Sequence, residues 1–238
     1  SKDSPQARID SPSQSWAAIT GSGSKERAEK AMRSVSEHLV RNEDGLVLLF
    51  DPPFDTSHLQ SGDIKGHLLG VDENGSLNTL GVLWAAMAWA RLGNGAEAVR
   101  LLRLMTPVNL ASNPERYRVE PYVVAEDIYR LQGKVGMGGW TWFTGAAGWM
   151  YRIWLEEVLG FRLHGNTLSL DPVIPPEWPG FTIRYRYGKT LYTIQIRNPV
   201  GVTHGISKVE MDGLPCRSLD LSLVDDGVDH HVNVRMGK

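Results

Sequence analysis

The chain has 238 residues, 42% of them hydrophobic and 22% charged, and a formal net charge of −2. This length is enough to bury a core and to form two domains. Lysine and arginine are scattered along the chain, so no basic field is available for nucleic acid or an anionic membrane. The longest apolar run is too short to span a bilayer, and the polar N-terminus lacks the apolar core of a signal peptide. We therefore expect no nucleic-acid partner and no direct membrane insertion.

The chemistry-bearing residue types exclude several classes of site. The single Cys216 cannot form an intrachain disulfide, which permits a reducing compartment, and we assign it no catalytic role. The seven histidines show no zinc-like pairing, and no glycine-rich nucleotide fingerprint follows a predicted strand. We predict a cytoplasmic chain that needs no metal and no organic cofactor. A longer parent protein can still be anchored in a membrane by segments outside this chain.

Helical spacing predominates in the first two thirds of the sequence. Residues 1–24 are rich in serine, glycine, glutamine and charge, which predicts a loose N-terminal lead-in. Residues 25–160 are predicted to be helical with long functional loops. Helices are expected at 25–41, 78–92 and 96–105. The segment 78–92 is apolar nearly all round, so we expect an inner helix whose apolar surface needs covering by self-association or by a missing part of the protein.

After Gly160 the pattern changes to an alternation of apolar and polar residues. This period of two predicts β-strands, and Gly188-Lys189 between two such runs predicts a hairpin turn. The strands are expected at 161–165, 168–170, 181–187, 191–197, 206–211, 219–224 and 230–235. Residues 161–238 are therefore predicted to form a small antiparallel β-sandwich.

The stretch from Gly138 to Trp149 holds three tryptophans and a phenylalanine around a Thr-Gly step. Apolar spacing from Ala147 onward predicts a helix that Thr144 can cap with its hydroxyl. Small residues in the first turn leave backbone N–H groups accessible, and the helix dipole favours an anion there. Aromatic faces beside such a site suit the C–H faces of a sugar ring. The alternative is that the glycines permit close packing and the tryptophans belong to the core.

This stretch resembles a signature of the inverting β-glucoside phosphorylases, the family of cellobiose and chitobiose phosphorylases. The resemblance is greatest to the C-terminal phosphorylase-like region of the cyclic β-1,2-glucan synthases, and it extends through most of the chain. The segments that carry it are 44–54, 64–66, 73–75, 119–125, 138–152, 174–180 and 223–227.

The resemblance implies a fold and a reaction. The fold is the C-terminal part of an (α/α)6 barrel followed by a small, jelly-roll-like antiparallel β-sandwich. In the reaction, inorganic phosphate is a co-substrate that attacks the anomeric carbon of a β-linked glucan, while one carboxylic acid protonates the leaving oxygen. Inversion follows, because phosphate replaces the activated water of an inverting glycosidase.

The family's functional residues are carried over position by position. Its Thr-Gly pair corresponds to Thr144 and Gly145, which are expected to bind phosphate. Its Glu-Asn-Gly motif places sugar-binding groups at Glu73 and Asn74, the latter also shaping the loop. Glu120 lies in another family-like loop, where sugar binding and a structural role are both open. The proposed sugar platform contains Trp140 and Trp142, and Trp149 extends it in one interpretation.

Two positions depart from the family pattern. Leu80 stands where the family's phosphate-binding histidine is expected, and a leucine cannot donate a hydrogen bond to phosphate. That loss typically costs about 1–3 kcal/mol, or roughly one to two decades in affinity. Asp72 stands where many relatives carry a basic residue, and its charge would repel a phosphate dianion nearby. Phosphate is therefore expected to bind weakly.

The resemblance also implies that the general acid and part of the barrel lie upstream of this chain. No catalytic residue is assigned, because Asp51, Asp55 and Asp127 are expected to serve turns and caps. The chain is interpreted as the C-terminal portion of a carbohydrate-active enzyme, a glycoside phosphorylase or a glucan synthase. The alternative is a non-catalytic glycan-binding or scaffolding module with a decayed phosphate site. Expected partners are a β-glucan oligosaccharide, phosphate, and the missing barrel part or a second copy.

Overall fold

The computed structural model describes residues 4–55 and 61–237, and these combine helices with several antiparallel sheets. The chain divides into two compact units. The first comprises Ser1–Leu92 with Arg100–Ile153, and the second comprises Gly93–Val99 with Trp154–Lys238. The boundary therefore falls within the helix α4 (Gly95–Met105) and next to Ile153.

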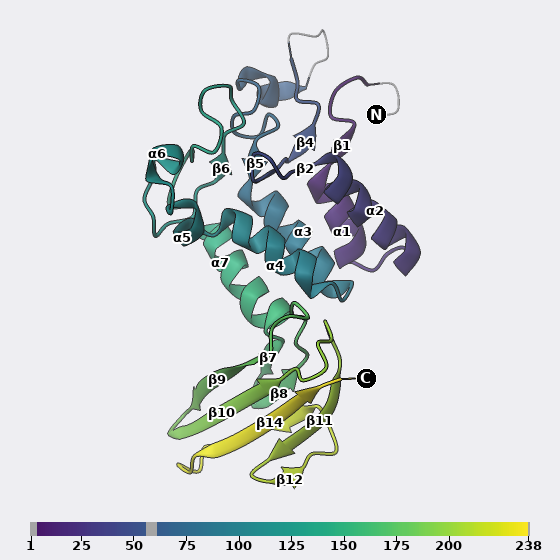
Figure 1. Ribbon diagram of the computed structural model, residues 1–238, viewed down its shortest axis with the longest axis vertical. Helices are drawn as coiled ribbons and strands as arrows, with labels where there is room; N and C mark the ends of the chain where they lie inside the picture. Colours follow the sequence, from purple (N-terminus) through teal and green to yellow (C-terminus); the bar gives the residue numbers. More distant parts are fainter. Residues whose placement is uncertain (1–3, 56–60, 238) are drawn as a thin grey trace. The chain divides into compact units, whose positions relative to one another are not determined.

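Helices and short strand pairs make up the first unit (Figure 1). Its helical elements are α1 (Ser11–Ile19), α2 (Lys25–His38), η1 (Gly62–Gly66), α3 (Thr79–Arg91), part of α4, α5 (Pro107–Leu110), α6 (Pro114–Tyr117) and α7 (Thr144–Arg152). Its strands are β1 (Ile9–Asp10), β2 (Val40–Arg41), β3 (Leu46–Val47), β4 (Phe50–Asp51), β5 (Leu77–Asn78) and β6 (Asp127–Ile128). The two-residue strand pairs satisfy backbone groups in the long loops between the helices.

Helix α3 is the centre of the first unit. Asn78 caps it by accepting a hydrogen bond from the backbone N–H of Gly81 at 3.2 Å. Ten of its residues are buried, including Val82 and Leu83, and it packs against α1 and α7 (Figure 1). Burying each such aliphatic side chain contributes roughly 1.5–3 kcal/mol. The predicted inner helix is confirmed, because most of its apolar side chains are buried.

Helix α1 occupies part of the segment 1–24, which the sequence predicted to be a loose lead-in. Residues 1–3 of that segment lie outside the described residues. The carboxylate of Asp10 caps α1 by accepting from the backbone N–H of Ser13 at 2.7 Å, and Pro12 stands in the first turn. Ala18 and Ile19 are buried. Packing against α3 stabilises a helix whose sequence shows little amphipathic pattern.

A five-stranded sheet and a three-stranded sheet make up most of the second unit (Figure 1). In space the strands run β12-β11-β14-β10-β9 and β13-β8-β7. Their bounds are β7 (Phe161–His164), β8 (Thr167–Leu170), β9 (Gly180–Tyr187), β10 (Thr190–Arg197), β11 (Ile206–Met211), β12 (Leu214–Pro215), β13 (Asp220–Ser222) and β14 (His230–Met236). The turn at Gly188-Lys189 is confirmed, because Thr190 pairs with Tyr187 across the β9–β10 hairpin.

One strand pair differs from the antiparallel prediction. Strand β14 runs parallel to β10, with Tyr192 opposite His230 and Arg197 opposite Arg235. The chain between these strands forms β11, β12 and β13 before it returns, which gives the long connection that a parallel pair requires. Alternation along each strand predicts its buried face, and the direction of its neighbour depends on the path of the chain between them.

Candidate functional site

Three segments that are far apart in the sequence are hydrogen-bonded side by side around β6. On one side, Asn78 of β5 pairs with Asp127. On the other, the backbone N–H of Gly139 donates to the carbonyl of Asp127 at 3.0 Å, and the N–H of Glu126 donates to the carbonyl of Trp140 at 2.7 Å. The Glu-Asn-Gly loop, the acidic strand β6 and the tryptophan-rich segment therefore form one local structure.

The Glu-Asn-Gly loop is held by the buried side chain of Asn74. Its Nδ2 donates to the carbonyls of Phe54 at 2.8 Å and His67 at 3.0 Å, and its Oδ1 accepts from the N–H of Phe54 at 2.8 Å. Gly75 has φ +81°, and a Cβ there would lie 2.9 Å from Cβ of Pro53. Glu73 is exposed beside them. Asn74 thus shapes the loop, and Glu73 is the member of the motif that solvent or a ligand can reach.

Asp72 stands in the left-handed region with φ +52°. Its backbone N–H donates to Oδ2 of Asp127 at 2.7 Å, and its own Oδ2 lies 3.1 Å from Nδ1 of His67. The position expected to repel phosphate therefore has a histidine beside its carboxylate, which offsets the negative charge whenever that imidazole is protonated.

The pKa values of two acidic side chains in the β6 segment are raised. Burial is the main cause that raises the pKa of Asp127 to about 6, and the charges of Asp72 and Glu126 add to it. The hydrogen bond from the backbone N–H of Asp72 acts in the opposite direction and lowers this pKa. Burial, Asp72 and Glu73 raise the pKa of Glu126, and His67 lowers it. Asp127 is 3% exposed. Asp127 was expected to be a loop residue, and Glu126 was not among the predicted residues. Their position inside an apolar run, Val-Val-Ala before and Ile after, was the signal for a buried acid.

Gly139 allows the carboxyl group of Asp127 to lie against the neighbouring backbone. A Cβ at this position would be 1.9 Å from Oδ1 of Asp127 and 2.9 Å from the ring of Tyr129. Any side chain at residue 139 would therefore displace the carboxylate. The glycine that the sequence analysis assigned to a signature is needed here for close packing.

Helix α7 begins at Thr144, and Phe143 is its N-cap residue, with no side-chain cap. The prediction that the Thr144 hydroxyl caps the helix was wrong, because Thr144 is already in the first helical turn. The N–H of Phe143 donates to the carbonyl of Val124 at 3.0 Å, which ties the start of the helix to the segment before β6. Thr144 and Gly145 are exposed, and a Cβ at Gly145 would meet nothing within 4 Å. Solvent or a ligand can thus reach Thr144 and Gly145 in the first turn.

Large aromatic side chains are exposed next to this helix. The exposed fractions are 75% for Trp140, 60% for Trp142 and 74% for Tyr122. The rings of Tyr122 and Trp142 meet edge to face, with centroids 6.2 Å apart, and Trp142 has φ +62°. Tyr122, which follows Pro121 in the segment 119–125 that carries the resemblance, was not among the predicted sugar-binding residues. Exposed aromatic groups together suit binding of a sugar ring better than core packing.

The remaining predicted residues lie elsewhere. Trp149 packs edge-on against Trp84 of α3, with centroids 6.4 Å apart, so it is not part of the exposed aromatic group. Glu120 is half-buried near Tyr117, where its charge adds to burial in raising the pKa of that hydroxyl to about 12. Leu80 is half-buried in the first turn of α3.

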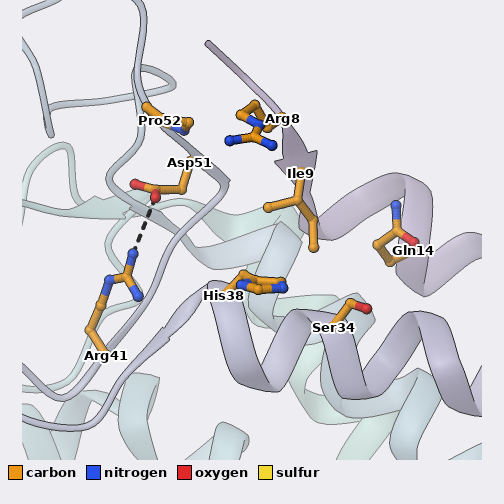
Figure 2. Close-up of a pocket in the computed structure, with 8 residues that line it drawn as sticks. All are labelled: Arg8, Ile9, Gln14, Ser34, His38, Arg41, Asp51 and Pro52. Carbon is orange, nitrogen blue, oxygen red and sulfur yellow. Dashed lines mark hydrogen bonds and ion pairs between the residues drawn. The ribbon is translucent and has the colours of Figure 1, made fainter. Parts of the chain in front are cut away.

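A separate surface cavity of about 550 Å³ lies beside β1 and α2 (Figure 2). Arg8 and His38 line it together with Arg41 and Asp51, which form an ion pair at 3.2 Å. A second arginine, Arg130, lies 2.9 Å from the other carboxylate oxygen of Asp51. Two cations thus hold the carboxylate of Asp51. None of the predicted sugar or phosphate residues lines this cavity.

Comparison with known families identifies the chain. Residues 1–160 match the catalytic domain of the glycosyl hydrolase 94 superfamily. The chain belongs to that superfamily. Residues 161–204 match the C-terminal domain of glycosyl hydrolase family 65. The resemblance to β-glucoside phosphorylases is thereby confirmed.

Curated relatives agree with this assignment. The cyclic β-(1,2)-glucan synthase of Rhizobium meliloti is 40% identical over 224 residues, which cover 90% of this chain and 8% of that protein. The N,N'-diacetylchitobiose phosphorylase of Vibrio proteolyticus is 32% identical over 233 residues, which cover 98% of this chain and 29% of that protein. The 3-O-β-D-glucopyranosyl-β-D-glucuronide phosphorylase of Paenibacillus borealis is 32% identical over 202 residues, which cover 84% of this chain and 26% of that protein. This chain spans less than a third of each of them. Within its described residues, no helix is both long and apolar enough to cross a membrane.

Proposed function

We propose that this chain supplies the C-terminal part of an enzyme that acts on β-linked glucans with inversion, either a glycoside phosphorylase or a cyclic β-1,2-glucan synthase. Its helical region, residues 25–160, contributes to an (α/α)6 barrel, and its strand-rich region, residues 161–238, forms a β-sandwich. Residues 1–24 lead into the barrel. The general acid comes from a part of the enzyme outside this chain. Membership in a catalytic family favours this function over a non-catalytic glycan-binding module.

One observation carries the proposal: the hydrogen bonds around β6 bring the exposed Glu73, the exposed aromatic group and the uncapped start of α7 into one local structure. These three parts match the needs of the reaction. A carboxylate binds sugar hydroxyls, aromatic faces bind the C–H faces of the ring, and a helix N-terminus binds an anion.

Phosphate is proposed to bind at Thr144 and Gly145. The N–H groups of the first turn and the positive end of the helix dipole favour a phosphate dianion there, and the Thr144 hydroxyl adds a donor. Leu80 supplies no hydrogen bond, so phosphate affinity is weaker than with a histidine at that position. The pairing of Asp72 with His67 moderates the repulsion expected from Asp72.

The sugar is proposed to lie on Trp140 and Trp142, with Tyr122 at their side and Glu73 bound to its hydroxyl groups. Asn74 holds the loop that presents Glu73. Glu120 supports the surrounding loops next to Tyr117. The proposed partners are thus a β-glucan oligosaccharide, inorganic phosphate as co-substrate and the remainder of the barrel.

Two alanine variants of α7 test the phosphate site. Gly145 and Gly148 both lie in this helix, both are exposed, and a Cβ on either would meet nothing within 4 Å. Alanine at either position should stabilise the helix by about 0.5–1 kcal/mol. Gly145 is in the first turn, so Gly145→Ala should weaken phosphate binding about tenfold, whereas Gly148→Ala should not.

The measurement is calorimetric titration of each variant with a short β-1,2-glucan, with and without saturating phosphate. Sugar binding that phosphate strengthens in the unmodified chain and in Gly148→Ala, but not in Gly145→Ala, supports the proposal. Sugar binding that phosphate leaves unchanged in all three would assign the chain to glycan binding without phosphorolysis. No sugar binding at all would contradict both functions for the chain by itself.

A further inference from the structure

We infer that Asp127 is a positioning residue of the proposed site: its buried carboxylate holds the loop that presents Glu73 against the segment that leads to Thr144. This inference rests on the proposed function and adds a regulation by pH. Asp127 does not reach the reacting atoms and is not proposed as a catalytic residue.

The contacts of Asp127 connect both sides of the site. Its Oδ2 accepts the backbone N–H of Asp72, the residue that precedes Glu73, at 2.7 Å. Its backbone carbonyl accepts the N–H of Gly139 at 3.0 Å, and its carboxyl group packs against that glycine. The main chain of this residue also belongs to the β5–β6 pair that leads into α3. Asp127, itself part of β6, thus contacts both other segments of the site.

The bond to Asp72 holds a conformation that the chain does not favour by itself. Asp72 has φ +52°, in the left-handed region that L-residues rarely adopt. Such a residue persists where its surroundings determine it, and these positions cluster at functional sites. A hydrogen bond to an ionised carboxylate is about twice as strong as one between neutral groups. Ionised Asp127 is therefore well suited to fix the direction in which the next residue, Glu73, projects.

The electrostatic surroundings show that this carboxylate is not placed for stability. The charges that act on it belong to Asp72 and Glu126, and both are acidic. Tyr129 lies on its own segment, and residues 137–140 contribute no charged side chain. Among the described residues, backbone N–H groups alone lower its pKa, and burial raises that pKa to about 6. A buried acid without a counter-cation costs stability, which is typical of a functional group.

The consequence is a site that depends on pH. Above pH 6 the ionised carboxylate holds the Asp72 N–H firmly. As the pH falls through 6 the group takes up a proton, the charge-assisted bond weakens, and the Glu73 loop loosens. Sugar affinity should then decline below pH 6, and the midpoint of this decline should coincide with the protonation of Asp127.

The test compares Asp127→Asn with Glu126→Gln, since both remove one carboxylate from adjacent positions and Glu126 accepts no bond from Asp72. Calorimetric titration with a short β-1,2-glucan is run from pH 5 to pH 8. At pH 7.5, Asp127→Asn should bind about tenfold more weakly and should lose the decline near pH 6. Glu126→Gln should keep the decline, with its midpoint at a lower pH, because the charge of Glu126 no longer raises the pKa of Asp127. Equal affinity and an unchanged midpoint in Asp127→Asn would overturn the inference.

Amide NMR separates this inference from the proposed function. The Asp72 N–H signal should shift with a midpoint near pH 6 in the unmodified chain and not in Asp127→Asn. Hydrogen exchange of residues 72–76 should be faster in Asp127→Asn than in Glu126→Gln. If no variant binds sugar, the proposed function fails, and these two readouts still decide whether Asp127 positions the loop. Exchange at equal rates in both variants would overturn the inference regardless of sugar binding.

Discussion

The region around β6 and the sheets of the second unit distribute aromatic and acidic side chains in opposite ways. Around β6, Trp140 and Trp142 are exposed while the carboxylate of Asp127 is buried. In the second unit, Tyr192 is fully buried, whereas Asp212 and Asp226 lie at the surface on either side of His230. Folding favours the second arrangement, because water solvates charges and excludes aromatic rings. The inverted arrangement around β6 costs stability, which binding of a ligand can explain.

The largest effect is expected from filling the space beside Asp127. Gly139→Ala places a Cβ 1.9 Å from the present position of Oδ1 of Asp127, so the carboxylate must move or the strands must separate. We expect a loss of about 3 kcal/mol in the free energy of unfolding, measured by urea denaturation. Gly148→Ala is the control and should be slightly stabilising. If Gly139→Ala were tolerated without loss, the packing that keeps Asp127 buried would be wrong.

Removing the buried charge should stabilise the protein. Burial raises the pKa of Asp127 from 3.8 to about 6, so the native state binds this proton more tightly than the unfolded state does. Its contribution to the free energy of unfolding therefore falls as the pH rises from about 4 to about 6 and stays low above. Asp127→Asn should be more stable than the unmodified chain by about 2 kcal/mol at pH 7.5, with little difference at pH 4.

Urea denaturation at both pH values measures this difference. Higher stability of Asp127→Asn together with weaker sugar binding would indicate that the carboxylate serves binding at the expense of stability. Removing a carboxylate that stabilises the fold would instead lower the free energy of unfolding. A variant that is less stable at pH 7.5 than the unmodified chain would show that Asp127 belongs with the structural charges.

Truncating an exposed aromatic side chain should affect binding more than folding. Trp142→Ala should weaken binding of a short β-1,2-glucan about tenfold. It should change the free energy of unfolding by less than about 0.5 kcal/mol, since Trp142 is 60% exposed. Tyr151, which is 68% exposed on α7, offers a matched control in Tyr151→Ala. Equal losses of affinity in the two variants would contradict the proposed sugar platform.

The smallest effect is expected in the second unit. The hydrogen bond to Asp212 and its charge, together with Asp226, raise the pKa of His230 above 6.5 against the effect of burial. A raised pKa means that this contribution is fully present below pH 6.5 and is lost as the pH rises through the native value. His230→Gln should therefore cost less than about 1 kcal/mol at pH 5.5 and nothing at pH 9.

Urea denaturation at pH 5.5 and pH 9 checks this prediction. Asp229→Asn, an exposed acid next to His230 in the sequence, serves as the control and should show no such pH dependence. A cost that persists at pH 9 would mean that stacking of His230 on Tyr192, and not its charge, stabilises the sheet.

Local patterns in the sequence carried much of the fold. The alternation after Gly160 predicted the strands and the turn at Gly188-Lys189, and the apolar run of 78–92 predicted the inner helix. Helix α1 was missed because its packing against α3, and not an amphipathic pattern of its own, stabilises it. The parallel β10–β14 pair was missed because alternation contains no information on the direction of a neighbouring strand.

The candidate site was predictable in its parts and not in its assembly. The resemblance placed functional residues at Glu73, Thr144 and Trp142. Their roles remain predictions, and the structure shows that all three side chains are exposed. Asp127 was assigned to a turn, because a lone aspartate in a sequence gives no measure of burial. Trp149 and Trp142 have the same side chain in the same motif. Packing against Trp84 separates them, leaving one half-buried and the other exposed.

The sequence by itself determined the family, the order of helices before strands, and the residue types available for binding sugar and phosphate, because local periodicity and motif spacing are written in neighbouring positions. The tertiary structure alone decided that Asp72, Asp127 and Gly139 meet, since their contacts join segments more than ten residues apart. Burial and pKa follow from such contacts, and so only the folded chain shows which acid is perturbed and which loop it holds.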